Sequence, residues 1–423
     1  MIKKLSPLLL LLLISVGTYG QQKTIKFDSY SLDDGLSQSS VTGIVQDKYG
    51  FIWISTQDGI NRYDGYSFKT FKNNPVNANS IPNNYIHFLD KDAQGDLWFG
   101  TNRGIGKMKP KDYTVERISR PTFPNLNGYI FTALTFDKDG RLWALTEKNG
   151  INIINLKSKK IESITSVKGN SELSAIYIDD KDQLWVGTES GETYYSEYPY
   201  GKFKSIDYNS IFTIAPVNGF YNTAGGGLMV LTQKGLFSID TDKRLQVYTE
   251  YTDIRYGSIN CVYIEDENTT WVGTGAAGLF LIQQTEDGRQ VISQYQNNAL
   301  DNSSIADNDI SCIYEDESGV FWIGTEQGVS KFDKYKQGFT TISLNNDPSK
   351  GLIDYSVWSF AEDNVGNTYI GTKKDLTVYN YEKQKYYHIV RDINTAHHLL
   401  SIYVESDDKI WLGYDDGVYM LNI

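Results

Sequence analysis

The sequence predicts an all-β fold, a β-propeller of four-stranded blades, from three observations. The phrase "QDKYGFIWIST" at residues 46–56 returns in close variants along the chain, such as "DKDAQGDLWFGT" and "YEDESGVFWIGT". These phrases are rich in Tyr, Ile, Val, Thr and Trp, which suit a pleated sheet. No stretch of 12 or more residues has convincing helical periodicity. A four-stranded unit cannot bury both of its faces alone, and stacking such units around an axis solves that problem.

Nine units can be counted from one position in the phrase, here called the marker. Markers recur 42 to 51 residues apart and fill the chain after its N-terminal segment. They are Trp53, Trp98, Trp143, Trp185, Met229, Trp271, Trp322, Tyr369 and Trp411. The count predicts one seven-bladed ring plus about two blades of a second, incomplete propeller.

A tight turn is expected just before each marker. Three residues before it stand residues that tolerate a left-handed backbone, namely Gly50, Gly95, Gly140, Asp182, Gly226, Asn268, Gly319, Gly366 and Asp408. Six residues before it stand Asp47, Asp92, Asp137, Asp179, Asp316 and Asp363, whose side chains can bond the backbone two residues on. Thr223, Glu265 and Glu405 break this pattern in the other three units.

Two more strands complete a unit after the marker strand. A second turn leads into an apolar strand, and a fourth strand follows in several units, for example "SFKTF" at 67–71 and "FTTIS" at 339–343. The marker would lie between neighbouring blades. A small residue two positions after it would let the next sheet approach, as at Gly100, Gly187, Gly273, Gly324 and Gly371. The extra strand "TIKFDSY" at 24–30 could close this ring or reach a second one.

The first 20 residues read as a signal peptide. Lys3 and Lys4 precede an apolar run at 8–16 and a small-residue segment that ends at Gly20. The alternative is a membrane anchor, but the run has less than half of the roughly 20 residues needed to span a bilayer. We therefore expect a signal peptide at 1–20, a seven-bladed propeller at 21–345 and two further blades at 346–423, all exported to the periplasm.

The net charge limits the classes of ligand that this chain is expected to bind, and the cysteine content limits the disulfide bonds that it can form. The formal net charge of −12 disfavours nucleic acid and anionic membranes, which bind Lys and Arg, but leaves room for a neutral ligand or for an anion in a local basic patch. Cys261 and Cys312 are too few for a disulfide framework. Each stands ten residues before its marker, so they occupy equivalent places in adjacent blades. A bridge would need their Cα atoms within about 7 Å, and two buried free thiols are favoured.

The repeat and the opening phrase "FDSYSLDDGLSQSSVTGIVQDKYGFIWISTQDGINRYDGYSFKTF" resemble two-component regulator propeller repeats. These repeats form the periplasmic sensor of hybrid two-component systems in the Bacteroidetes. The resemblance implies two seven-bladed propellers, a small all-β domain, a membrane helix, a histidine kinase and a DNA-binding regulator. Such sensors detect oligosaccharides released from a polysaccharide and switch on genes for its use.

This sequence departs from that plan because it stops at Ile423, inside the ninth repeat, without a kinase His motif, a receiver Asp or a membrane helix. The resemblance therefore implies a truncated sensor. Its intact parent would be a homodimer, and only the missing C-terminal helix would contact the membrane. The last two blades would expose a sheet face that a further blade normally covers, so we expect lower stability or solubility than in the parent.

Ligand binding is expected where loops that enter the innermost strands converge at the channel mouth. These loops are rich in Asn, Asp, Ser and Tyr, a mixture suited to sugars. The candidate ligand-binding residues are Tyr85, Tyr129, Arg255, Tyr256, Tyr355 and Trp358. The alternatives are that these are turn-forming and packing residues, or that the ligand sits on the second propeller or between the two.

No catalytic residue, metal or cofactor is predicted. His87, His388, His397 and His398 are too scattered for a zinc or catalytic site, and the acidic turn at 90–96 lacks the full calcium loop with its distal Glu. A propeller glycosidase or lyase remains an alternative, but the sequence singles out no pair of carboxylates for hydrolysis. A secreted scaffold that binds a partner protein is the third possibility.

Overall fold

The computed structural model describes residues 25–423 except 171, 207–214, 224, 250–257, 286, 288, 336–341, 343, 346, 374, 382, 384, 390–397, 407–408 and 423. The predicted signal peptide lies outside the described residues. The chain divides into two compact units, Met1–Tyr335 and Lys336–Ile423, and each is considered by itself. The division falls at 335/336, whereas the sequence placed it at 345/346, and much of the intervening segment is not described.

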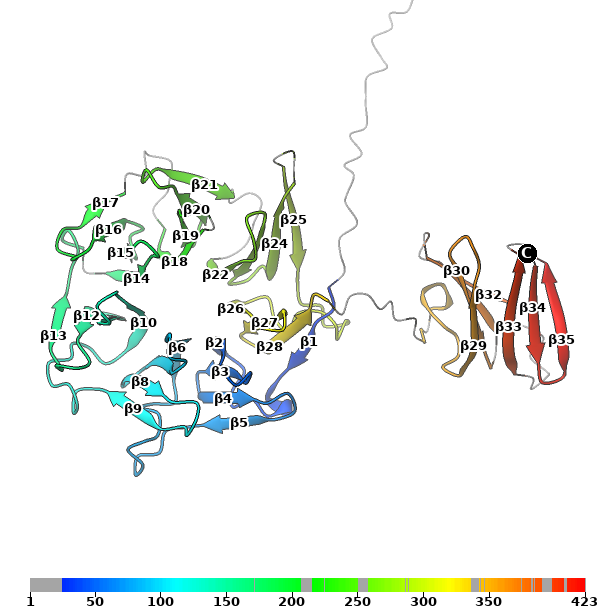
Figure 1. Ribbon diagram of the computed structural model, residues 1–423, viewed down its shortest axis with the longest axis horizontal. Coiled ribbons are helices and arrows are strands. Elements are labelled where there is room, and N and C mark those ends of the chain that lie inside the picture. The colour runs from blue at the N-terminus through cyan, green and yellow to red at the C-terminus, as the bar shows by residue number, and fades with distance from the viewer. Residues whose placement is uncertain are drawn as a thin grey trace, which may run out of the picture. The chain divides into compact units, whose positions relative to one another are not determined.

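The described strands of the first unit form seven four-stranded antiparallel sheets arranged as a ring (Figure 1). The predicted β-propeller is confirmed. The first four blades are β2 (Val41–Gln46), β3 (Ile52–Thr56), β4 (Gly59–Tyr63) and β5 (Phe68–Phe71); β6 (Ile86–Lys91), β7 (Leu97–Thr101), β8 (Gly104–Met108) and β9 (Val115–Ile118); β10 (Phe131–Phe136), β11 (Leu142–Thr146), β12 (Gly150–Ile154) and β13 (Ile161–Ile164); β14 (Leu173–Ile178), β15 (Gln183–Thr188), β16 (Thr193–Glu197) and β17 (Lys204–Ser205).

The remaining three blades are β18 (Val217–Asn222), β19 (Leu228–Thr232), β20 (Gly235–Ile239) and β21 (Leu245–Thr249); β22 (Ile259–Ile264), β23 (Thr269–Thr274), β24 (Leu279–Gln284) and β25 (Gln290–Tyr295); β26 (Ile310–Glu315), β27 (Val320–Thr325), β28 (Gly328–Asp333) and β1 (Asp28–Tyr30). The first strand of each blade contacts the first strand of the next, and β2 contacts β26. The ring is therefore closed.

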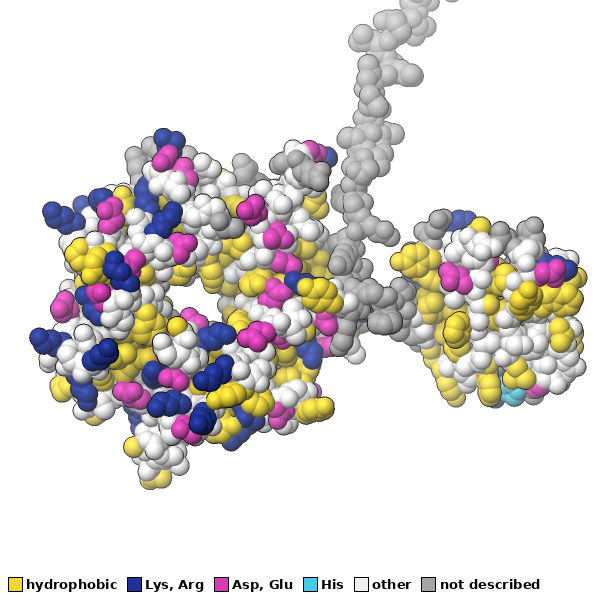
Figure 2. All heavy atoms as spheres, in the orientation of Figure 1, with side chains coloured by type: hydrophobic (Ala, Val, Ile, Leu, Met, Phe, Trp, Pro, Cys, Tyr) yellow, Lys and Arg dark blue, Asp and Glu magenta, His cyan; other side chains and the backbone are white. Residues whose placement is uncertain are grey.

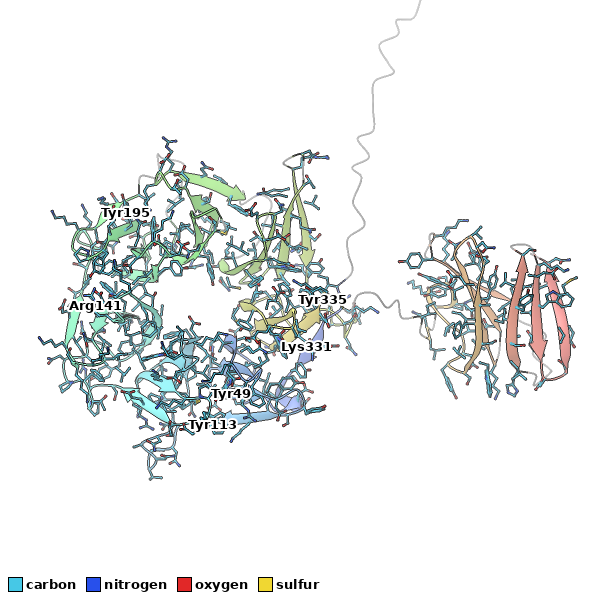
Figure 3. All side chains as sticks on the ribbon, in the orientation of Figure 1. Tyr49, Tyr113, Arg141, Tyr195, Lys331 and Tyr335 are labelled. Atoms are coloured by element: carbon cyan, nitrogen blue, oxygen red, sulfur yellow. The ribbon has the colours of Figure 1, made fainter. Side chains whose placement is uncertain are left out.

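The N-terminal strand closes the ring. β1 pairs antiparallel with β28, with Asp28 opposite Lys331, and so takes the fourth place in the seventh blade. The segment expected to fill that place, 339–343, lies mostly outside the described residues. Lys331 strengthens the closure, because its ammonium group donates to the Tyr30 hydroxyl at 2.6 Å and lies 5.4 Å from the centre of the Trp322 ring (Figure 3).

Each marker lies in the second strand of its sheet, as predicted, and most are tied to the turn before them. In Asp47, Oδ1 accepts the backbone N–H groups of Tyr49 and Phe51, which forms the predicted turn. Its Oδ2 accepts the indole N–H of Trp53 at 2.7 Å, a bond that the sequence analysis did not anticipate. In eight of the nine described sheets, a marker Trp or Tyr donates to the acidic residue six positions earlier, at 2.5 to 3.0 Å. We call this arrangement the acid–aromatic pair.

The turn in the sixth blade differs from the prediction. Asn268 is not among the described residues with positive φ, whereas Gly50 has φ of 87° and Asp182 of 59°. The acid here is Glu265, whose longer side chain reaches the indole of Trp271, while Asp266 instead accepts the N–H of Asn268 at 2.8 Å. The turn therefore closes without a left-handed residue. Asp408, expected at the same position of the last sheet, is not described.

Neighbouring blades approach closely at the glycine two positions after the marker, as predicted. A Cβ placed on Gly100 would lie 2.3 Å from the carbonyl oxygen of Phe131 in the next blade. Trp53 packs in one apolar cluster with Leu89, Leu97 and Phe99 of the next blade. The marker side chain and the adjacent small residue thus join successive sheets.

The second unit contains two sheets, a four-stranded one and a three-stranded one. Their strands are β29 (Val357–Glu362), β30 (Asn367–Thr372), β31 (Leu376–Asn380) and β32 (Lys385–Ile389), then β33 (Leu399–Ser406), β34 (Lys409–Tyr414) and β35 (Gly417–Asn422). Tyr369, Leu376 and Leu399 join them in one core. Large apolar side chains stay exposed on both sheets, including Phe360 at 78% and Tyr403 at 65%. Apolar side chains are therefore exposed on both sheets of this unit.

Helix is almost absent from the described residues. The two helical segments are single 3-10 turns, η1 (Leu32–Asp34) in the ring and η3 (Pro348–Lys350) in the second unit. Ser31 caps η1, because its side chain accepts the N–H of Asp33 while its own N–H donates to Asp34 at 2.8 Å. The prediction that helix is nearly absent holds for the described chain.

Candidate binding site

The ring has two faces that differ in the connections they carry. Because the strands of a blade are antiparallel, the turn from its first to its second strand lies at one edge, and the connection to the next blade lies at the other. We call these the aspartate-turn face, which carries turns such as 47–51, and the loop face, which carries connections such as 72–85. Figure 2 shows the ring hollowed at its centre, where the two faces communicate.

A β-bulge recurs near the start of the innermost strand of every described sheet. The pairing shifts register at this point, for example between Val41 and Gly43. A bulge re-aims the extra side chain away from the regular alternation. In the ring the residues at this position are Thr42, His87, Thr132, Ser174, Asn218, Asn260 and Ser311, all polar and all half-exposed. We call these seven residues the collar.

Several collar side chains bridge to the next blade. Ser174 Oγ donates to the carbonyl oxygen of Val217 at 2.7 Å, and Asn218 Nδ2 donates to that of Ile259 at 2.7 Å. Asn260 Nδ2 repeats the pattern on Ile310 at 3.0 Å. The amide donors of Asn218 and Asn260 are thereby used within the ring. Collar side chains therefore link neighbouring blades by hydrogen bonds.

The mouth is locally acidic between the sixth, seventh and first blades. Burial, followed by the nearby carboxylates of Glu326 and Asp307, raises the pKa of Asp309. Glu326 accepts a hydrogen bond from Ser40 Oγ of the first blade. Because like charges already oppose one another here, an anionic ligand would be disfavoured.

Two predicted site residues, Tyr85 and Tyr129, lie on the loop face of neighbouring blades. Tyr85 is half-buried, and its ring centre lies 4.7 Å from that of the collar residue His87. Tyr129 is 56% exposed, and the guanidinium carbon of Arg120 lies 4.1 Å from its ring centre. The loop face therefore presents two aromatic groups beside the polar collar.

Of the other four predicted residues, two belong to the second unit and two are not described. Tyr355 and Trp358 belong to the second unit, where they are 83% and 54% exposed. Trp358 lies at the bulge of β29, 5.4 Å from the His398 ring. Arg255 and Tyr256 lie outside the described residues. The ligand-binding assignment of all six remains a prediction.

The sequence analysis missed the collar, although its signal is present. Each collar residue stands eleven positions before a marker, and this column is polar in all seven units of the ring. The equivalent residues of the second unit are Trp358 and Leu400. The role of this recurring polar position becomes clear only when the structure shows that it is the bulged residue of the innermost strand.

The thiols and carboxylates have local structural roles. Both cysteines are free, with Cys261 buried and Cys312 half-buried. Burial raises the pKa of Cys312 to about 11 and that of Cys261 as well, so both are thiols at neutral pH.

In the acidic turn at 90–96, the Asp92 carboxylate accepts hydrogen bonds from backbone N–H groups and the Trp98 indole and forms an ion pair with Lys107. Among the described residues, no group of three His, Cys, Asp or Glu side chains is placed to hold a metal ion.

Three stretches of the chain, residues 35–58, 80–103 and 304–327, match the family model "Two component regulator propeller". These three stretches are therefore similar to two-component regulator propeller repeats. A curated relative, Histidine kinase P4 of Formosa agariphila, is 28% identical in an alignment that covers 96% of this chain and 38% of the relative. The chain thus spans well under half the length of that kinase.

Solved structures agree on the propeller fold. The extracellular domain of a hybrid two-component system from B. thetaiotaomicron superposes with a TM-score of 0.70 and 20% identity, covering 94% of this chain and 53% of that domain. Virginiamycin B lyase from Staphylococcus aureus superposes with a TM-score of 0.57 and 14% identity, covering 73% of this chain and 99% of the lyase. At these identities the likeness shows the fold alone. Of the helices in the described segments, none is long and apolar enough to cross a membrane.

Proposed function

We propose that this chain is the ligand-sensing propeller on the periplasmic side of a hybrid two-component system. The observation that carries the proposal is the match to two-component regulator propeller repeats. It is supported by the superposition on the extracellular domain of such a system, which covers 94% of this chain. The predicted signal peptide supports export. In the longer protein, a membrane helix and a kinase would pass the signal inward, within a homodimer, to a transcriptional regulator.

The ligand we propose is a neutral oligosaccharide released from a polysaccharide, bound at the loop-face mouth of the ring. The collar carries hydroxyl and amide oxygens that can accept hydrogen bonds from sugar hydroxyls even where their donors are used within the ring, and Tyr85 and Tyr129 offer flat faces to sugar C–H surfaces. The carboxylates of Asp309 and Glu326 favour a neutral sugar over an acidic one.

The proposed event is binding without chemistry. Carboxylates at fixed positions of the repeat are occupied by turn amides and marker side chains, as Asp47 illustrates, so they are not free to act as an acid and base pair. The similar lyase fold makes an enzyme the second candidate, and a partner-binding scaffold the third.

The test is a panel of neutral and acidic oligosaccharides, read both as a shift in melting temperature and as product formation by chromatography. At least one neutral oligosaccharide should raise Tm and remain intact. Tyr85→Ala and Asn260→Ala should each weaken its binding about tenfold or more, whereas Tyr66→Ala should not. Tyr66 is a matched control, because it is 97% exposed in a turn on the opposite face. Formation of a product would favour the enzyme, and a panel without any shift would favour the scaffold.

A further inference from the structure

The fifth blade departs from the acid–aromatic pair. Its marker is Met229, and Thr223 stands where an acid stands in the eight paired sheets of the described chain. Thr223 Oγ1 accepts the N–H of Gly227 at 3.0 Å, so it holds the turn but receives no marker side chain. The turn is therefore preserved while the indole and the carboxylate are both absent.

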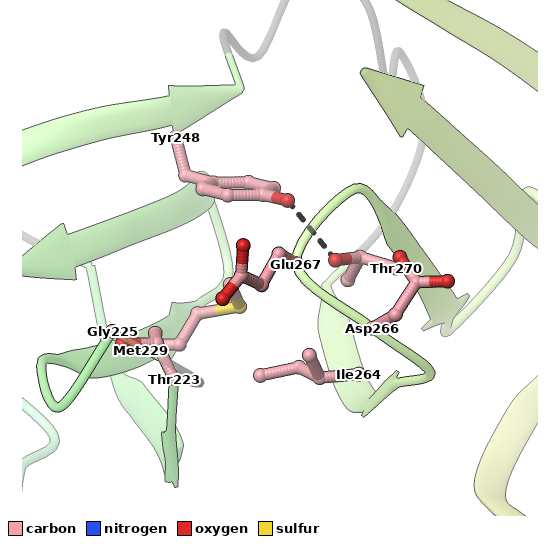
Figure 4. A pocket seen from close by; sticks show the side chains of 8 residues that line it. All are labelled: Thr223, Gly225, Met229, Tyr248, Ile264, Asp266, Glu267 and Thr270. Atoms are coloured by element: carbon pink, nitrogen blue, oxygen red, sulfur yellow. Dashed lines mark hydrogen bonds between the residues drawn. The ribbon is translucent and has the colours of Figure 1, made fainter. Parts of the chain in front are cut away.

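A cavity of about 330 Å³ lies at this point, between the fifth and sixth blades on the aspartate-turn face (Figure 4). Met229 is 2% exposed and packs in the cluster that joins these two blades. The cavity walls include Thr223, Met229, Tyr248, Ile264, Glu267 and Thr270. Elsewhere in the ring a marker Trp occupies the corresponding space, as Trp53 does between the first and second blades. Loss of the indole thus accounts for the opening.

The walls combine an aromatic face, a thioether and two carboxylates, Glu267 and Asp266, of which Asp266 already accepts the N–H of Asn268. The Tyr248 hydroxyl and Thr270 Oγ1 lie 3.0 Å apart, which fixes the ring across the gap between the two blades. The Glu267 side chain extends into the cavity between Tyr248 and Met229 (Figure 4). Within the described structure, Glu267 forms no hydrogen bond or ion pair, and no Lys or Arg is among the lining residues.

We propose that this cavity binds a small ligand that carries an ammonium group. A cation there would meet the Glu267 carboxylate and the π-face of Tyr248, which both attract positive charge, while Met229 and Ile264 cover an apolar or ring-shaped body. The volume, at the lower end of the range for ligand pockets, suits a molecule of one or two sugar rings. The site is separate from the proposed oligosaccharide site, because it opens on the other face.

Binding should be measured by calorimetry with probes that share a body and differ in charge. The first set is glucosamine, glucose and glucuronate, and the second is n-hexylamine and n-hexanol. The amines should bind at least tenfold more tightly than their neutral partners, and glucuronate should bind worst. Binding of both amines identifies the ammonium group alone as the determinant, and binding of glucosamine only assigns the site to amino sugars. Equal binding of amines and neutral partners overturns the proposal.

Two variants test the location. Glu267→Gln should weaken amine binding at least tenfold, while the matched control Glu147→Gln, an exposed carboxylate on the loop face, should leave it unchanged. Thr223→Asp combined with Met229→Trp should restore the acid–aromatic pair, fill the cavity and abolish amine binding. If the double variant does not fold, Glu267→Gln alone tests the location of the site. Its side chain is exposed and has no described partner, so it can be replaced without loss of the fold. Amine binding unaffected by Glu267→Gln refutes the assignment.

Discussion

The same local motif occurs in the closed ring and in the two-sheet unit Lys336–Ile423, with different surroundings. In the ring, the indole of Trp53 donates to Asp47, and both residues are almost completely buried. In the two-sheet unit, the indole of Trp411 donates to Glu405 at 2.5 Å, but the Trp is half-buried and the Glu is exposed. The turn and its hydrogen bond are therefore local properties, whereas burial depends on a neighbouring blade.

The glycines after these markers show the same contrast. A Cβ on Gly100 of the ring would lie 2.3 Å from a backbone oxygen of the next blade. A Cβ on Gly413 of the two-sheet unit would meet only atoms of Ser401 among its three nearest, the closest being the hydroxyl oxygen at 2.3 Å. A rigid backbone cannot yield to an added methyl group, but a serine hydroxyl can rotate. The ring should therefore be far less tolerant of substitution.

The largest expected effect is that of Trp53→Phe. Removal of the indole N–H leaves Oδ2 of the buried Asp47 without its hydrogen-bond donor and opens a small cavity, so the free energy of unfolding of the ring should fall by about 3 kcal/mol. Trp411→Phe, where water can reach Glu405, should cost under about 1 kcal/mol. Denaturant unfolding of both variants measures the difference, and equal losses would show that the neighbouring blade does not matter.

Gly100→Ala should produce the next largest change. Overpacking against Phe131 and the Phe88 ring should destabilise the ring by about 2 kcal/mol, while Gly413→Ala should cost a few tenths of a kcal/mol. Gly201→Ala is the control for the loss of glycine itself, because a Cβ there meets nothing within 4 Å. If Gly413→Ala is as costly as Gly100→Ala, the proposed difference in packing is wrong.

Acid should weaken the ring through the half-buried carboxylate of Asp92. Burial opposes ionisation of Asp92, but hydrogen bonds from the Trp98 indole and the Asp96 N–H, with Lys107 nearby, hold its pKa below the ordinary 3.8. A carboxyl group with a lowered folded-state pKa stabilises the fold above its ordinary pKa, and this stabilisation is lost as pH falls through the folded value. The Tm of the ring should thus decline below about pH 4.

Asp92→Asn should flatten that decline, and the matched control Glu147→Gln should not. The hydrogen bonds from Trp411 and Lys409 also lower the pKa of Glu405, but this carboxylate is exposed, so its contribution is screened by water. Calorimetric scans from pH 7 to pH 3 test both statements. An acid loss that Asp92→Asn leaves unchanged would contradict the role of Asp92.

The smallest effect on stability is expected from the exposed apolar residues of the two-sheet unit. Phe360→Ser and Tyr403→Ser should change the free energy of unfolding by about 0.5 kcal/mol or less, yet raise the concentration at which the protein stays in solution. Tyr66→Ser in the ring, which removes one exposed aromatic side chain, should leave solubility unchanged. A large loss of stability in either variant would show that the face is packed in solution.

Sequence periodicity predicted much of the fold, because each blade is built from local signals. The marker, the turn residues before it and the glycine after it recur at fixed spacing, and even Met229 and Tyr369 were placed correctly in second strands. The acid–aromatic pair escaped prediction, since its indole bond requires the turn and the strand to be placed in space together. The prediction of a left-handed residue at Asn268 was wrong, since the turn there instead closes with Asp266 accepting the Asn268 N–H.

The candidate sites depended on the tertiary structure to a greater extent. Tyr85 and Tyr129 could be assigned to one face from loop position alone, but the collar became visible only through the recurrent bulge. The cavity beside Met229 could not be located from sequence, because a missing indole shows its effect only between two packed sheets.

The sequence by itself determined the repeat, the strand order within a blade and the turn chemistry, because these depend on residues close together along the chain. Only the tertiary structure decided that Asp28–Tyr30 closes the ring on β28, and which indoles are buried. Both outcomes rest on contacts between residues far apart in sequence, and such contacts form only when neighbouring sheets exclude water from the surface between them.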